Sequence, residues 1–147
     1  NDGSGYFTDE SALRMTAAML LSDFGTHAEI ADINQDGVAD IVKDNALVHY
    51  ALRAMYNDPD NEGFFNIYEN FETSQSPYDF NLGDLNRDGR LDVVVSSDFL
   101  DRYLYNLGND PLGRVIWGPA KVFTFLAGAD DEFAGNDLIV VHARAFM

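Results

Sequence analysis

Residues 32–40 read Asp-Ile-Asn-Gln-Asp-Gly-Val-Ala-Asp, and the β-branched residues Ile41 and Val42 follow directly. A second stretch, Asp-Leu-Asn-Arg-Asp-Gly-Arg-Leu-Asp, begins 52 positions later at residues 84–92 and continues into three valines at 93–95. The two stretches are identical at positions 1, 3, 5, 6 and 9 and differ at the other four. The acidic and amide side chains are therefore the repeated feature, and strand-forming residues follow each copy.

Both stretches place oxygen-bearing side chains where a loop can surround a hard divalent cation. Ca²⁺ takes six to eight oxygen ligands at about 2.3–2.6 Å, and related loops add a backbone carbonyl from position 7. Glycine at position 6 permits the positive φ that turns the chain around the ion. The predicted Ca²⁺ ligands are Asp32, Asn34, Asp36, Val38 and Asp40 in the first loop, and Asp84, Asn86, Asp88, Arg90 and Asp92 in the second.

The competing interpretation is that Asp, Asn and Gly simply cluster in polar turns between strands. Two copies that agree at every side-chain ligand position favour calcium over that interpretation. A helix–loop–helix site is disfavoured, because its twelfth position requires a bidentate Glu and a helix follows it. The twelfth positions here are Lys43 and Val95, among strand formers.

The nine-residue loop that closes on Asp and enters a strand resembles those of integrin-α-like propellers, in the FG-GAP and VCBS repeat families. The resemblance extends to a turn of the type Asn-Asp-Gly-x-Gly-x-Phe, which opens this chain at residues 1–7. Related versions run from 56 to 65 and from 105 to 117. These landmarks recur about every 50 residues, which is a period expected of four-stranded propeller blades.

The resemblance implies an all-β fold, namely a partial β-propeller of about three repeats built from four-stranded antiparallel sheets across residues 1–147. Approximate repeats are 8–68, 69–118 and an incomplete 119–147, with residues 1–7 ending a preceding blade. The expected strands are 28–31, 40–42, 46–55 and 64–68 in the first repeat, 79–83, 93–96, 102–107 and 115–117 in the second, and 122–126 and 138–143 in the third. Residues 10–21 fit either a short helix or an outer strand.

Three blades are too few for a ring, which usually needs four to eight. The remaining blades are expected from a longer chain, with association of several copies as the alternative. A third calcium loop is suspected at residues 130–137, before the strand-forming segment 138–141. It departs from the pattern, because closure on Asp137 puts Ala129 and Phe133 at positions 1 and 5. We interpret it as a degenerate loop.

Composition narrows the partners and the compartment. The formal charge of −16 argues against nucleic acid, which favours a basic surface. The absence of cysteine excludes disulfides and thiolate metal sites. The apolar run at 17–21 is far too short for a transmembrane segment. Extracellular calcium modules work with weak sites of about 10⁻⁴–10⁻³ M, so we expect a secreted or cell-surface protein.

Catalytic residues are not identifiable. The three histidines, His27, His49 and His142, lack the spacing of a metalloprotease helix, and no Gly-x-Ser-x-Gly elbow is present. Glu69 and Glu72 are a weak candidate for a glycosidase pair, since sequence spacing cannot show their separation across a cleft. The sequence therefore predicts no enzyme.

Three aromatic residues, Tyr103, Tyr105 and Trp117, have two interpretations. They are suitable for a sugar- or peptide-binding face, but aromatic side chains also fill the space between strands and sheets, which is the stronger interpretation.

The sequence thus predicts a calcium-binding extracellular propeller module with a structural, adhesion or ligand-binding role, its ligand being a protein or a carbohydrate. The alternatives are part of a secreted polysaccharide-active enzyme such as a lyase, and a self-assembling surface or filament protein.

Overall fold

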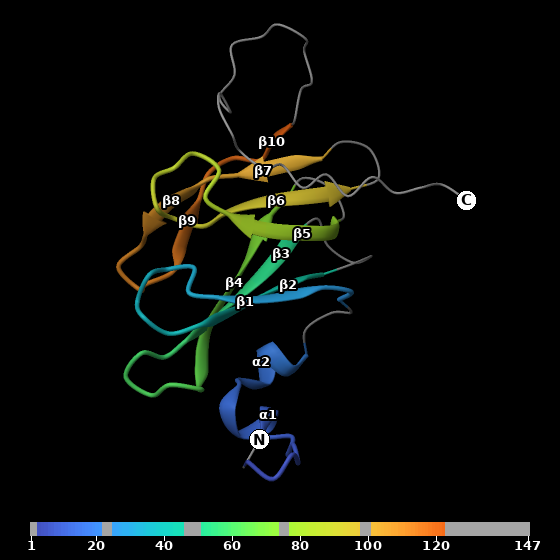
Figure 1. The fold of residues 1–147 in the computed structure, drawn as a ribbon, viewed down its shortest axis with the longest axis vertical. Helices are drawn as coiled ribbons and strands as arrows, with labels where there is room; N and C mark the ends of the chain where they lie inside the picture. The colour runs from blue at the N-terminus through green and yellow to red at the C-terminus, as the bar shows by residue number, and fades with distance from the viewer. Residues whose placement is uncertain (1–2, 22–24, 46–50, 74–76, 98–100, 123–147) are drawn as a thin grey trace, which may run out of the picture.

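The computed structural model describes residues 3–21, 25–45, 51–73, 77–97 and 101–122. The described chain is mostly β, and its main sheets are antiparallel, as expected (Figure 1). The first sheet has the order β1-β2-β3-β4. Its strands are β1 (Ala28–Ala31), β2 (Asp40–Asp44), β3 (Ala51–Asn57) and β4 (Phe65–Glu72).

The second sheet also has four strands, in the order β10-β7-β6-β5. They are β5 (Pro77–Gly83), β6 (Asp92–Ser97), β7 (Arg102–Leu104) and β10 (Lys121–Val122). Between β7 and β10 the chain forms a two-stranded hairpin of β8 (Asn106–Asn109) and β9 (Val115–Trp117), called here the β8–β9 hairpin. Each calcium-type loop joins the first and second strands of its sheet, which is the position implied by the resemblance.

The N-terminal segment contains two short helices, α1 (Ser11–Arg14) and α2 (Ala17–Leu20). The α2 helix begins after Thr16, whose hydroxyl oxygen accepts a hydrogen bond from the Met19 amide at 3.4 Å. Residues 3–10 form no strand. The described part of the segment 1–7, which was expected to be the last strand of a preceding blade, is therefore not a strand. Among the described residues, no helix has the length and apolarity needed to cross a membrane.

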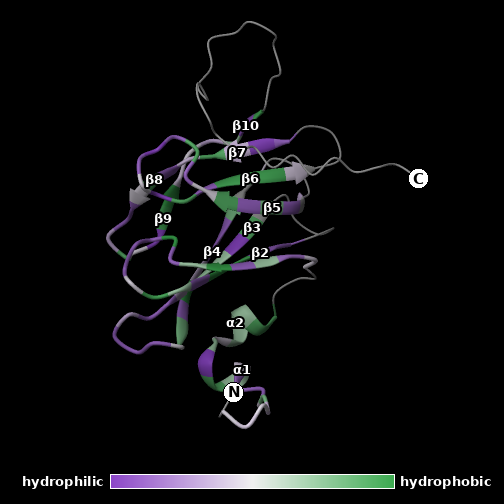
Figure 2. Ribbon diagram, in the orientation of Figure 1, coloured by the Kyte–Doolittle hydropathy of each residue, from purple (hydrophilic) through white to green (hydrophobic). Residues whose placement is uncertain are grey.

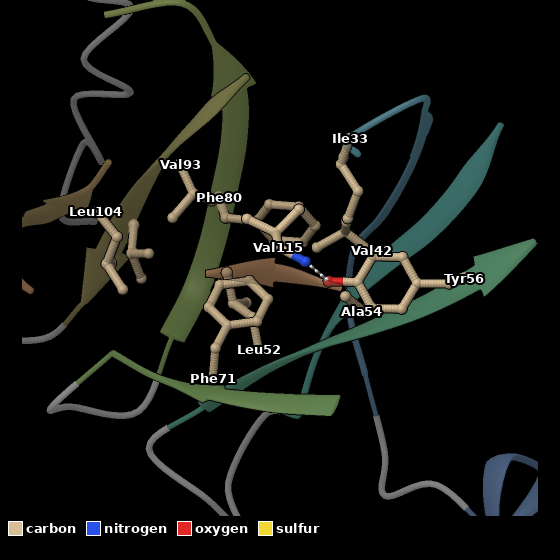
Figure 3. Close-up of a cluster of buried hydrophobic side chains, with 11 residues drawn as sticks. Ile33, Val42, Leu52, Ala54, Tyr56, Phe71, Phe80, Val93, Leu104 and Val115 are labelled. Atoms are coloured by element: carbon tan, nitrogen blue, oxygen red, sulfur yellow. Dashed lines mark hydrogen bonds between the residues drawn. The ribbon is translucent and has the colours of Figure 1, made fainter. Parts of the chain in front are cut away.

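Both sheets bury their apolar faces in one shared core (Figure 3). Leu52 and Phe71 come from the first sheet, and Phe80 and Val93 come from the second. In β6, Val93 and Val95 are buried, and the strand is among the more hydrophobic segments in Figure 2. The strand period of two thus directs alternate side chains into the space between the sheets.

Several strand limits differ from the sequence-based boundaries. The segment expected as one strand at 102–107 is divided between β7 in the second sheet and β8 in the hairpin, and the segment 115–117, expected as the fourth strand of that sheet, is β9 of the hairpin. The β4 strand runs to Glu72, so a repeat boundary at residue 69 lies inside it. Lys121 and Val122 pair with Tyr103 and Arg102 in the second sheet, whereas the sequence suggested that residue 122 opens a third blade. Pairing with neighbouring strands, which the local sequence does not show, sets these limits and the sheet to which each strand belongs. The rest of the expected third repeat lies outside the described residues.

Candidate metal centres

The first calcium-type loop leaves β1 at Ala31 and enters β2 at Asp40. Its chain reverses through two residues in the left-handed region, Gln35 at φ 60° and Gly37 at φ 97°. The second loop has the same pair at the corresponding positions, Arg87 at φ 62° and Gly89 at φ 84°. Glycine adopts this conformation without strain, while Gln and Arg do so at a cost that the loop must offset.

Side-chain oxygens of the first loop bind its own backbone amides. Asp32 accepts hydrogen bonds from the amides of Asp36 and Gly37, both at 3.0 Å. Asn34 accepts from Asp36 at 3.2 Å, and Asp36 accepts from Val38 at 3.0 Å. The carboxylates at positions 1 and 5 and the amide at position 3 are therefore turned toward the interior of the loop.

The second loop repeats every one of these bonds. Asp84 accepts from the amides of Asp88 at 3.0 Å and Gly89 at 2.9 Å. Asn86 accepts from Asp88 at 3.0 Å, and Asp88 accepts from Arg90 at 2.9 Å. The loops thus share one backbone geometry, although they differ in sequence at four positions.

The closing aspartates are buried and attach the first loop to β3 and the second loop to β8 of the hairpin. Asp40 accepts from the amides of Ile33 at 3.2 Å and Asn57 at 2.9 Å. Asp92 accepts from Leu85 at 2.9 Å and Asn106 at 2.8 Å. Both aspartates are 0% exposed. Asp40 and Asp92 therefore have a structural role that does not depend on an ion.

Sequence reasoning missed Asn57 and Asn106, which receive that attachment. The signal was present, since Tyr56-Asn57 and Tyr105-Asn106 repeat the same dipeptide. The Asn57 side chain also donates to the Ala39 carbonyl at 2.9 Å. The Asn106 side chain instead donates to the Ile33 carbonyl of the first loop at 3.0 Å. This second asparagine therefore links the two sheets, which its local sequence does not show.

The carboxylates of each loop lie near enough to influence one another's charge. Burial, aided by the charges of Asp36 and Asp32, raises the pKa of Asp40 to about 6 despite the lowering effect of two backbone hydrogen bonds. Burial likewise raises the pKa of Asp92, with Asp88 and Asp84 adding to the effect. A cation in either loop would relieve this repulsion.

The donor set fits Ca²⁺, which prefers carboxylate, amide and carbonyl oxygens. Each carboxylate oxygen has two lone pairs, so an oxygen that accepts an amide hydrogen can still face a cation. In the described part of the chain, no three acidic or histidine side chains lie close enough together to hold an ion as they stand. Binding would therefore require the carboxylates to draw inward.

The two loops differ in their surroundings. Asn34 is 6% exposed, because its backbone carbonyl accepts from Asn109 at 2.6 Å and its side chain donates to the Gly113 carbonyl at 2.9 Å. The β8–β9 hairpin thus covers the first loop. In the second loop, the Arg90 guanidinium pairs with Asp88 and donates to the Asn106 carbonyl at 2.7 Å.

The remaining candidates are placed as follows. His27 lies 3.3 Å from a carboxylate oxygen of Asp79, and its ring meets Phe80 edge-on with centroids 4.9 Å apart. Glu69 accepts a hydrogen bond from the Tyr56 hydroxyl. Three of the sequence-based candidates lie outside the described residues: His49, His142 and the degenerate loop 130–137.

The aromatic residues take part in packing. Tyr103 is buried, and its ring meets Tyr105 with centroids 5.2 Å apart. Trp117 stacks on Phe71 with centroids 4.4 Å apart and an interplanar angle of 18°. Because β9 carries Trp117 and β4 carries Phe71, this contact joins the β8–β9 hairpin to the first sheet.

No protein-family model, curated protein or solved structure matches the chain. The resemblance to the FG-GAP and VCBS repeats therefore depends on the two loops and the recurring turns.

The metal-free protein is expected to become more stable by about 1 kcal/mol as the pH falls from 7.5 to 5. The pKa of Asp40 is about 6 in the folded chain and 3.8 as the model value for an unfolded one. The folded state therefore binds the proton first, and stability declines as the pH rises through this range. Thermal melts in EGTA at both pH values measure the effect.

Calcium should reverse that trend, because its carboxylate ligands must be ionised. In excess Ca²⁺ the melting temperature is expected to fall on acidification to pH 5. If the melting temperature depends on pH in the same way with and without Ca²⁺, Asp40 cannot be both the buried carboxyl that titrates and a ligand of the ion.

Proposed function

We propose that the chain is a calcium-binding module whose two ions stabilise the corners of neighbouring β-propeller blades. The observation that carries this proposal is the repeated loop geometry, in which both loops have the same hydrogen bonds, the same two left-handed positions and the same buried closing aspartate. The two loops differ in sequence at four positions but keep the same geometry, which indicates that both need it for the same purpose. A turn lined with oxygen atoms is suited to binding Ca²⁺.

The arrangement of the sheets supports the propeller. The two sheets share a core, as neighbouring blades do. The first strand of the second sheet, β5, lies beside β2, and His27, next to the first strand β1, contacts Asp79 and Phe80 of β5. First strands that meet at one side correspond to the innermost strands of blades arranged around an axis.

The role proposed for the ion is structural. The first loop carries three carboxylates and is joined to the β8–β9 hairpin through Asn34 and through the Ile33 carbonyl. An ion bound there would neutralise the mutually repelling carboxylates and fix the loop between β1 and β2. Its binding free energy would therefore add to the stability of the folded state. Sites of this kind are filled where calcium is plentiful, which favours an extracellular or cell-surface location.

Calorimetric titration tests the proposal. The full chain is expected to bind two equivalents of Ca²⁺, and Asp36→Ala and Asp88→Ala are each expected to remove one. Both side chains are exposed, so these substitutions leave the core intact. Absence of binding heat, together with no change in the melting curve, would refute the calcium assignment.

The two sites are expected to differ in affinity, with the second the weaker. Arg90 pairs with Asp88, whereas Val38 stands at the equivalent position of the first loop. Arg90→Ala removes this competitor and should tighten the second site by about threefold to tenfold. Titration calorimetry of the Asp36→Ala background isolates that site.

Arg87→Ala is the matched control, because it removes the same charge from the same loop but leaves the Arg90–Asp88 pair in place. An equal gain from both substitutions would show that only long-range charge is involved, and would contradict direct competition for Asp88.

A further inference from the structure

A pocket of about 590 Å³ lies beside the β8–β9 hairpin, where the hairpin meets β4. Its lining includes the carboxylates of Glu69 and Asp110, the guanidinium of Arg114, and the apolar surfaces of Phe71, Trp117 and Pro119. This volume falls within the range of about 300–1,000 Å³ that is common for small-molecule sites. Neither calcium loop contributes to the lining.

The indole of Trp117 is the first element of the pocket. Phe71 stacks against it, which fixes the plane of the ring. The indole N–H is buried and interacts with the Glu69 carboxylate, which lowers the pKa of that carboxyl. Trp117 therefore offers a ligand its apolar ring surface rather than a free donor.

The Glu69 carboxylate is the second element. One of its oxygens accepts a hydrogen bond from the Tyr56 hydroxyl, and that hydroxyl in turn accepts from the Val115 amide at 2.9 Å (Figure 3). The carboxylate is thus held by both the first sheet and the hairpin. An ionised carboxylate only accepts hydrogen bonds, so a ligand must supply donors to it.

Asp110 and Arg114 form the third element. Arg114 donates two hydrogen bonds to one Asp110 oxygen, at 2.8 Å from Nε and 2.6 Å from Nη2. The other Asp110 oxygen accepts from the amides of Leu112 and Arg114 at 2.8 and 3.0 Å. The opposite charges of Asp110 and Arg114 neutralise each other, and the amide hydrogen bonds hold Asp110 in place. The two side chains therefore form a fixed polar side of the pocket.

We propose that this pocket binds an uncharged sugar unit of a glycan. A sugar ring supplies hydroxyl donors for the Glu69 carboxylate and C–H groups that pack on Trp117 and Phe71. A peptide offers fewer donors in the same volume. An acidic sugar is disfavoured by Glu69 and by the net charge of −16. The proposal does not depend on calcium.

Trp117 is the only tryptophan in the chain, so its fluorescence reports directly on the pocket. The full chain is titrated with glucose, galactose, mannose, xylose and N-acetylglucosamine, and with their β-1,4-linked disaccharides. At least one neutral sugar is expected to give a saturable change with a dissociation constant of about 1–10 mM. Glucuronic acid is expected to bind more weakly. A matching response to a tripeptide panel with none to sugars would overturn the proposal in favour of a peptide site.

Glu69→Gln should weaken sugar binding at least fivefold, because one carboxylate acceptor is lost while the amide oxygen can still accept from Tyr56. The matched control is Glu62→Gln, which makes the same charge change at an exposed residue that does not line the pocket. If Glu69→Gln fails to fold by circular dichroism, Asp110→Asn takes its place. An equal response in the pocket variant and the control would overturn the proposal.

Each titration is repeated in excess Ca²⁺ and in EGTA, with calcium binding measured separately by calorimetry. Sugar binding without any calcium binding would support the pocket and refute the calcium proposal. Calcium binding with no response to any sugar on the panel would overturn the pocket and leave the calcium proposal in place.

Discussion

Asp40→Ala is expected to destabilise the metal-free protein by about 2–4 kcal/mol. The substitution leaves the buried amides of Ile33 and Asn57 without their acceptor, and each unsatisfied donor costs about 1–3 kcal/mol. Part of that loss is offset, because the substitution also removes a buried carboxylate whose raised pKa reflects its cost of burial. Urea denaturation in EGTA measures the change.

Asp36→Ala serves as the comparison within the same loop. Asp36 is exposed, so we expect a loss below about 1 kcal/mol in EGTA. Asp92→Ala, at the closing position of the second loop, should cost about as much as Asp40→Ala because its two acceptor bonds are equivalent. If Asp40→Ala costs no more than Asp36→Ala in EGTA, the closing aspartate has no ion-independent role.

Much of the first sheet could be predicted from sequence. Its first strand, residues 28–31, coincides with β1, and the loop position between β1 and β2 follows from strand formers on both sides. The loops are predictable because their requirements are local: a glycine for positive φ, and oxygen side chains that bind amides two to five residues away.

Contacts between distant segments could not be predicted. Nothing local to Asn109 indicates that its side chain donates to the Asn34 carbonyl, 75 residues away. The strand expected at 46–55 is described as β3 from Ala51 onward, with its end set by pairing to β4. The sequence drew attention to Glu69 and Trp117 separately, but it could not place them in one pocket with Arg114, because these residues meet only after the hairpin packs on the first sheet. Such placements depend on tertiary packing rather than on local sequence.

Calcium removal is expected to lower the melting temperature by about 5–11 °C for the tighter site. A free Ca²⁺ concentration one hundred times the dissociation constant stabilises the folded state by about 2.7 kcal/mol. For a chain of this length, each kcal/mol shifts the midpoint by about 2–4 °C. The effect should be concentrated in the first loop, which is joined to the β8–β9 hairpin through Asn34 and Ile33. Calorimetric melts in EGTA and in excess Ca²⁺ measure it.

Three controls separate a specific site from a general effect of charge on a chain of net charge −16. Mg²⁺ at equal concentration should restore little of the midpoint, because it demands near-ideal octahedral geometry and keeps its water. The Asp36→Ala and Asp88→Ala double variant should melt at the same temperature with and without Ca²⁺. Asp60→Ala, which removes an exposed carboxylate outside both loops, should retain the full calcium shift. A melting temperature that changes neither in EGTA nor when Ca²⁺ is restored would show that the ion has no structural role. Binding that favours the folded state must raise its stability.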